Sequence, residues 1–130
     1  MVIDTSAILA MMLGESGADR LESAIEADRT RLVSAATVVE ASLVLMGRYG
    51  GAGDAELDRF LRAIGAEVVP VGEDQVRLAR DAALHYGRGR HPAGLNYGDC
   101  FSYALAVAVG EPLLFVGSDF AQTDLTRAPW

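Results

Sequence analysis

Short apolar segments alternate with longer amphipathic segments along the whole chain. The short ones are typical of buried strands, and the longer ones carry apolar residues at helical spacing. We therefore predict strands at residues 1–3, 31–34, 66–71 and 112–116. Helices are predicted at residues 7–12, 17–28, 36–48, 54–64, 74–86 and 97–109, with glycine-rich loops at 50–53 and 87–94 and a terminal segment at 117–130.

Strands that alternate with helices indicate the α/β class. Parallel strands need long crossover connections, and apolar strands suit a sheet that is covered on both faces. We expect one domain over residues 1–130, built on a central, mainly parallel sheet. Ligands of such sheets bind at the carboxyl ends of the strands, and two acidic residues, Asp4 and Asp119, follow the first and last predicted strands.

The composition is that of a soluble domain, with 130 residues of which 51% are hydrophobic and 22% charged. No apolar run approaches the roughly 20 residues of a membrane span and no secretory signal is evident, so we expect a cytoplasmic protein. Cys100 is the single cysteine, which excludes an intrachain disulfide. Without a cluster of cysteine and histidine, any metal must be bound by oxygen atoms.

The net charge of −7 argues against a basic surface that wraps nucleic acid. All 11 basic residues are arginine, and no GxxxxGK[ST] or GxGxxG motif is present, which removes the main support for a nucleotide-binding protein. One compact basic segment contains Arg88, Arg90 and His91, with Tyr97 close behind. We predict that it contacts phosphates and bases of unpaired RNA, the alternative being a flexible solvated loop.

Four acidic residues stand alone in apolar stretches. They are Asp4, Glu40, Asp99 and Asp119. A buried carboxylate must reach solvent, cap backbone amides, pair with an arginine or bind a cation. Convergence on one pocket would explain all of them together.

Each of these acids also has a purely structural interpretation. Glu40 lies three residues after Thr37, the spacing of a capping box. Asp4 and Asp99 could bond nearby backbone amides, and Asp119 could be a turn residue.

Converging carboxylates repel one another, and a hard cation such as Mg²⁺ or Mn²⁺ relieves that repulsion through oxygen ligands. A cation bound in this way can polarise a phosphoryl oxygen and activate water. The sequence therefore favours metal-assisted hydrolysis of phosphodiesters. Thr5 and Ser6 are candidates for orienting Asp4 or a bound water, or alternatively for capping the helix that follows.

Four segments together resemble the PIN-domain ribonucleases, most closely the VapC-type toxins. They are residues 1–7, 38–41, 95–100 and 118–120, so the resemblance extends over essentially the whole chain. It implies a three-layer α/β/α sandwich and a magnesium-dependent endoribonuclease that acts on transfer or ribosomal RNA. It also implies that Asp4, Glu40, Asp99 and Asp119 are the acidic site residues, with Asp4 and Asp99 most directly tied to the metal.

The same resemblance implies a small VapB-type antitoxin as partner, and we expect a homodimer or a toxin–antitoxin hetero-oligomer. Many relatives carry a further acidic or hydroxyl group near the fourth acid. Here Gly117 and Ser118 precede Asp119, which leaves the number of metal ions and the role of Ser118 open. Asp124 is a weaker candidate in a polar terminal turn, and Trp130 could pack on the domain or contact a partner.

Two other function classes share the small acidic α/β form. A phosphoacceptor signalling domain would need a lysine near its aspartate, and this chain has no lysine. A catalytically silent interaction domain would use the isolated acids to bind arginines of a partner. Metal-dependent cleavage of RNA distinguishes the predicted enzyme from both.

Overall fold

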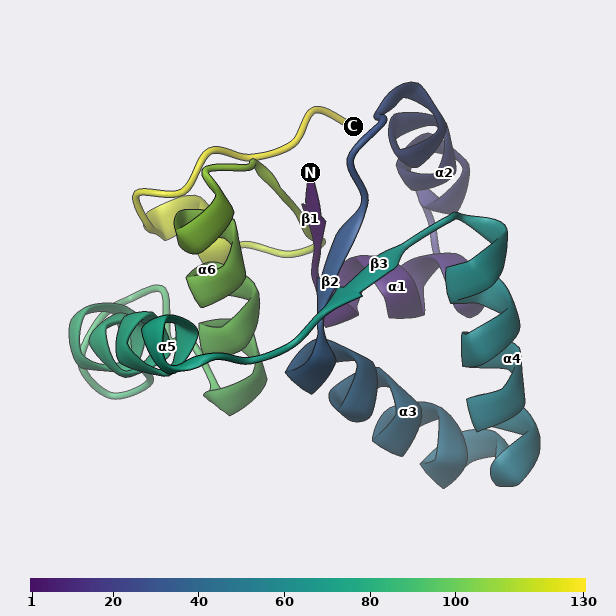
Figure 1. Cartoon of the computed structure of the whole chain (residues 1–130), viewed down its shortest axis with the longest axis horizontal. Coiled ribbons are helices and arrows are strands. Elements are labelled where there is room, and N and C mark those ends of the chain that lie inside the picture. The colour runs from purple at the N-terminus through teal and green to yellow at the C-terminus, as the bar shows by residue number, and fades with distance from the viewer.

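The computed structural model describes residues 1–130 as a parallel four-stranded sheet covered by helices (Figure 1). The strands are β1 (Val2–Ile3), β2 (Leu32–Ser34), β3 (Glu67–Val69) and β4 (Leu113–Leu114), in the order β3-β2-β1-β4. The helices are α1 (Thr5–Met12), α2 (Ala18–Ala27), α3 (Ala35–Tyr49), α4 (Gly51–Ala63), α5 (Glu73–Tyr86), α6 (Tyr97–Val109) and the short 3₁₀ helix η1 (Phe120–Gln122). The predicted α/β class and parallel sheet are confirmed.

The sheet separates two hydrophobic cores because successive side chains of a strand point to opposite faces. Met1 and Ile3 pack in the core that contains α1, α2, α3 and α4, whereas Val2 packs in the core that contains α5 and α6. Figure 1 shows α5 and α6 on one side of the strands and α1, α2, α3 and α4 on the opposite side. This arrangement is the expected three-layer α/β/α sandwich.

One predicted loop is wrong. Residues 50–53 do not form a loop, because α4 begins at Gly51 instead of Asp54 and only Gly50, with a φ of 62°, makes the turn after α3. A Cβ on Gly53 would lie 2.6 Å from the carbonyl oxygen of Leu45. Gly53 therefore permits close packing of α4 against α3, a use of glycine that resembles a loop signal in the sequence.

The other differences concern element ends. The predicted strand at 66–71 is confined to Glu67–Val69, and the strand at 112–116 to Leu113–Leu114. Helix α1 begins at Thr5, two residues before the predicted start. The structure contains no helix long and apolar enough to cross a membrane.

The C-terminal segment returns along β4, where Arg127 forms a bridge with Leu113. Trp130 donates a hydrogen bond from Nε1 to the carbonyl oxygen of Phe115 at 3.1 Å. The guanidinium groups of Arg20 and Arg127 lie over its ring. Trp130 thus packs on the domain, which is the first of the two roles considered for it.

Candidate functional site

Asp4 lies at the carboxyl end of β1 and is the N-cap of α1. Its Oδ2 atom accepts hydrogen bonds from the Ser6 backbone N–H at 2.9 Å and the Ser6 hydroxyl at 2.6 Å. Only 2% of the residue is exposed, and the other carboxylate atom, Oδ1, is buried without a hydrogen-bond partner. Capping the helix therefore accounts for one oxygen of Asp4 and leaves the other unexplained.

The two hydroxyl residues after Asp4 hold the surrounding groups in place. Ser6 Oγ also accepts the Val116 backbone N–H at 3.0 Å, which ties the chain after β4 to the start of α1. Thr5 Oγ1 donates a hydrogen bond to Glu40 Oε2 at 2.5 Å. The alternative in which Thr5 or Ser6 caps the helix is wrong, because Asp4 occupies the cap position.

Glu40 belongs to α3, and its carboxylate lies against Gly98 at the start of α6. The proposed capping box of Glu40 with Thr37 is wrong, since Ser34 is the N-cap of α3. Thr37 is instead buried and hydrogen-bonded through its hydroxyl to Ser102 at 3.0 Å. The side chain of Glu40 is therefore free of any helix-capping role.

Asp99 forms a capping box with Asn96 at the N-terminus of α6. This confirms the expectation that Asp99 could bond nearby backbone amides. Its Oδ2 atom accepts the Asn96 backbone N–H at 2.7 Å, and its own N–H donates to Asn96 Oδ1 at 3.0 Å. Burial raises the pKa of Asp99 to about 6, against the lowering effect of the Asn96 hydrogen bond. The negative charges of Asp4, Glu40 and Asp119 raise the pKa of Asp99 further, so all three carboxylates lie within electrostatic reach of Asp99.

Asp119 is exposed after β4, at the start of η1, and makes no capping hydrogen bond. The neighbouring Ser118 is also exposed, and no hydrogen bond holds its hydroxyl. No three of the acidic, histidine or cysteine side chains form a ready-made ligand cluster. Asp4 and Asp119 follow β1 and β4, whereas Glu40 and Asp99 belong to α3 and α6, and hydrogen bonds engage one oxygen each of Asp4, Glu40 and Asp99.

These residues fit a divalent cation on two observations. A buried carboxylate oxygen without a partner, as in Asp4, is costly unless it meets a positive charge. The pKa of Asp99 is raised by burial and by the neighbouring negative charges, so the Asp99 carboxylate also lacks a compensating positive charge. Carboxylate oxygens are the ligands that Mg²⁺ and Mn²⁺ prefer.

Backbone hydrogen bonds close the base of the basic segment. Its ends are joined by hydrogen bonds from the Arg88 N–H to the Leu95 carbonyl oxygen and from the Leu95 N–H to the Tyr86 carbonyl oxygen. Arg88 and Arg90 are exposed and form no ion pair, so both guanidinium groups are free. His91 is half-buried against the ring of Tyr86, and its Nδ1 atom accepts the Ala93 N–H at 3.1 Å. His91 therefore has a structural role here, whereas the exposed Arg88 and Arg90 fit both interpretations of this segment, an RNA contact and a solvated loop.

Two residues of the site were missed from the sequence. Asn96 positions Asp99, and the spacing of a capping box, Asn-x-x-Asp, could have indicated it. Gly98 gives room to Glu40, a contact between distant segments that no local pattern contains. Asp124, the weaker candidate in the terminal turn, is exposed and also accepts a hydrogen bond from the Tyr103 hydroxyl at 2.7 Å. It thereby attaches the terminal segment to α6.

The sequence model of the PIN domain matches residues 1–125 of this chain. The chain belongs to the PIN-domain family. This PIN domain is 53% identical over 125 residues to Ribonuclease VapC30 of Mycobacterium tuberculosis, which covers 96% of this chain and 95% of the relative. It is 49% identical over 125 residues to Ribonuclease VapC of Mycolicibacterium smegmatis, with 96% and 97% covered. The predicted resemblance to VapC-type proteins is confirmed.

Solved structures of this family have the same fold as this PIN domain. VapC20 of Mycobacterium tuberculosis, described as a sarcin–ricin loop cleaving toxin, superposes with a TM-score of 0.77 over 98% of both chains at 15% identity. A toxin–antitoxin complex from Klebsiella pneumoniae gives a TM-score of 0.72 at 17% identity, over 99% of this chain and 97% of the other. At these identities the likeness establishes the three-layer fold alone.

Proposed function

We propose that this PIN domain is a metal-dependent endoribonuclease toxin that hydrolyses phosphodiester bonds in RNA. The observation that carries the proposal is the unpartnered, buried Oδ1 atom of Asp4, together with the closeness of Asp99 to the charges of Asp4, Glu40 and Asp119 from separate parts of the chain. A cation held there compensates charges that the protein leaves uncompensated. The ribonuclease names of relatives at about 50% identity support the same activity.

Asp4 and Asp99 are the proposed principal metal ligands, and Glu40 and Asp119 complete the acidic surroundings. Mg²⁺ is the proposed cofactor, and Mn²⁺ can substitute for it because it accepts the same oxygen ligands. When bound, the cation supplies Lewis-acid polarisation of a phosphoryl oxygen and a more acidic water. Ser6 holds one oxygen of Asp4 and thereby fixes the orientation of the other, and Thr5 does the same for Glu40.

The proposed substrate is an unpaired segment of a transfer RNA or ribosomal RNA. The free guanidinium groups of Arg88 and Arg90 offer contacts to phosphates close to the N-terminus of α6. Unpaired bases turn away from the strand more easily than paired ones, which lets a phosphate approach carboxylates at a sheet edge. A VapC relative in the solved structures is itself described as cleaving the sarcin–ricin loop.

The proposed partner is a VapB-type antitoxin, and solved relatives include toxin–antitoxin complexes. Helix α3 presents Val39 and Leu43 with 58% and 61% exposed, and Met46 extends this stripe by another turn. An exposed stripe at this spacing suits a protein partner, either an antitoxin helix or a second copy of the chain.

The decisive experiment sequences the RNA ends produced by the purified protein with and without Mg²⁺. New ends are expected only with the metal. The Asp99→Asn variant, purified in the same way, is the control for a contaminating nuclease. A folded protein that leaves RNA intact with both Mg²⁺ and Mn²⁺ would refute the proposal and favour a catalytically silent interaction domain.

A further inference from the structure

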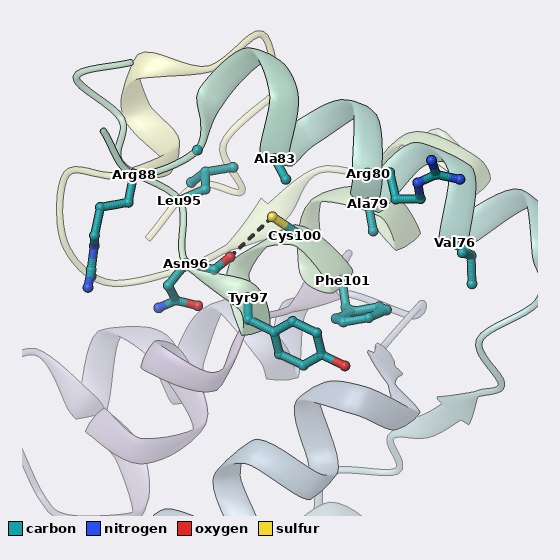
Figure 2. Close-up of a pocket in the computed structure, with 11 residues that line it drawn as sticks. Val76, Ala79, Arg80, Ala83, Arg88, Leu95, Asn96, Tyr97, Cys100 and Phe101 are labelled. Atoms are coloured by element: carbon teal, nitrogen blue, oxygen red, sulfur yellow. Dashed lines mark hydrogen bonds between the residues drawn. The ribbon is translucent and has the colours of Figure 1, made fainter. Parts of the chain in front are cut away.

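An apolar groove of about 620 Å³ lies between α5 and α6, beside the acidic site (Figure 2). Its volume is in the range of pockets that bind small organic groups. The walls are mainly apolar and come from both helices and from Leu95, two residues before α6: Val76, Ala79, Ala83, Leu95, Cys100 and Phe101. The Cys100 thiol is turned inward to donate a hydrogen bond to the Asn96 carbonyl oxygen at 3.1 Å, so it acts as part of the wall.

The groove has an aromatic platform at one side. Tyr97 is 81% exposed, the largest exposed fraction among the large hydrophobic side chains of this protein. Its ring packs edge-to-face with Phe101, with ring centroids 5.0 Å apart and an interplanar angle of 71°. Phe101 thus supports the Tyr97 ring from one side, and most of the ring surface is left free for stacking.

The charges around the groove favour a ligand that carries phosphate. Arg80 and Arg88 line it on opposite sides in Figure 2, and neither forms an ion pair. No acidic residue lines the groove, although the chain has a net charge of −7. A mainly apolar cavity with an aromatic surface and free cations is suited to a nucleotide.

Asn96 connects the groove to the acidic site. Its backbone N–H and side-chain oxygen are both used in the capping box with Asp99, while its side chain also lines the groove. The side-chain NH₂ donates to no protein group and is available to a ligand. A chain of RNA that places one phosphate at Asp99 can therefore place a neighbouring base in the groove.

We propose that this groove binds an unpaired base next to the scissile phosphate, stacked on Tyr97, and so contributes to the choice of cleavage site. This proposal rests on RNA being the substrate, as proposed above. Arg80 and Arg88 hold the flanking phosphates, and the Asn96 NH₂ contacts an acceptor on the base edge. The other occupant that the apolar walls could accept, an apolar segment of a protein partner, makes no use of the two free arginines.

The test measures binding of fluorescein-labelled RNA hexanucleotides by anisotropy in EDTA, so that hydrolysis does not interfere. Each position of the hexanucleotide is replaced in turn by an abasic nucleotide. The native protein should lose about tenfold in affinity at one or two positions. Tyr97→Ala should bind the intact hexanucleotide about tenfold more weakly and be insensitive to the abasic substitution at those positions, whereas Tyr97→Phe should behave as the native protein.

Tyr49→Ala is the matched control, because Tyr49 is an exposed tyrosine at the end of α3 and does not line the groove. The proposal would be overturned if abasic substitution weakened binding equally in the native protein and in Tyr97→Ala at every position. It would also be overturned if the native protein did not bind the hexanucleotide at all. A Tyr97→Ala variant that binds RNA normally but no longer co-purifies with the antitoxin would assign the groove to a protein partner instead. Cleavage of long RNA in Mg²⁺ is measured separately. A protein that shows the expected loss of affinity on abasic substitution but does not cleave RNA would refute only the enzymatic function.

Discussion

The carboxylate of Glu40 occupies the space that a side chain on Gly98 would need: a Cβ on Gly98 would lie 2.2 Å from both carboxylate oxygens. Helix α3 and helix α6 therefore meet at the site through one glycine. We expect Gly98→Ala to displace Glu40 and reduce RNA cleavage by about tenfold or more, since the acidic group would move from the reacting phosphate. The fold should persist, because the displaced atoms are the end of a flexible side chain and alanine favours the helix by up to about 1 kcal/mol.

Gly47→Ala is the control for that substitution, because Gly47 lies in α3 and a Cβ there meets nothing within 4 Å. Cleavage rates and thermal unfolding of both variants are compared. Normal cleavage by Gly98→Ala would show that the position of Glu40 is not important for the reaction.

Asp4→Asn and Asp99→Asn should each abolish most of the ribonuclease activity. Each change removes a charged ligand, and losing about 3 kcal/mol of transition-state stabilisation slows cleavage roughly a hundredfold. The control is Asp19→Asn, an exposed residue of α2 outside the site. Rates are measured over a titration of Mg²⁺, and native rates in either folded variant would remove that residue from the metal site.

The ionisation of Asp99 should destabilise the metal-free fold. Its pKa is raised from 3.8 to about 6, so the folded state binds this proton more tightly than the unfolded state. This tighter proton binding contributes to the stability of the folded state. The contribution is fully present below pH 3.8 and is lost as the pH rises through about 6. At neutral pH, metal-free Asp99→Asn should be more stable than the native protein by about 1 kcal/mol, after allowance for solvent screening of the partly exposed carboxylate.

Urea unfolding in EDTA at acidic and neutral pH measures this difference. Asparagine can still accept the Asn96 N–H through its oxygen, so the capping box is kept in the variant. A stability difference that does not change between the two pH values would contradict the assigned effect of burial on Asp99.

Removing the two arginines of the basic segment, with Arg88→Ala and Arg90→Ala together, should weaken RNA binding and its dependence on salt. Each phosphate contact to a single strand contributes about 0.7 to the slope of log K against log salt, so two contacts contribute about 1.4. The matched double variant replaces Arg59 and Arg62, which already pair with Glu56 and Asp58 on α4. An unchanged slope in the first variant would place its arginines outside the RNA contact.

An antitoxin should inhibit this PIN domain by placing an arginine among the acidic side chains. A guanidinium group offers the positive charge that Asp4 and Asp99 lack and forms strong hydrogen bonds to carboxylates. An apolar helix of the antitoxin should supply most of the affinity. Co-expression with the neighbouring gene, purification and a cleavage assay test this: failure to co-purify, or full activity of the complex, would refute it.

The sequence by itself determined the elements and the candidate acids. Apolar residues at spacings of two or of three to four indicate strands and helices because the period is a local property of the backbone. The parallel sheet followed from the alternation of these elements. Asp4, Glu40, Asp99 and Asp119 were recognisable because a charge is costly in an apolar stretch wherever that stretch folds.

The tertiary structure alone decided how these acids are held. Thr5 bonds Glu40 across 35 residues and Ser6 bonds Val116 across 110, and neither pair shares a local pattern. Gly53 was misleading for the same reason, since it lies inside α4 and faces the backbone of Leu45. Gly98 was correctly placed in a helix, but its contact with Glu40 follows only from the packing of α6 against α3. Periodicity tells which face of an element is buried, whereas the groups that meet at that face depend on the packing of segments far apart in the chain.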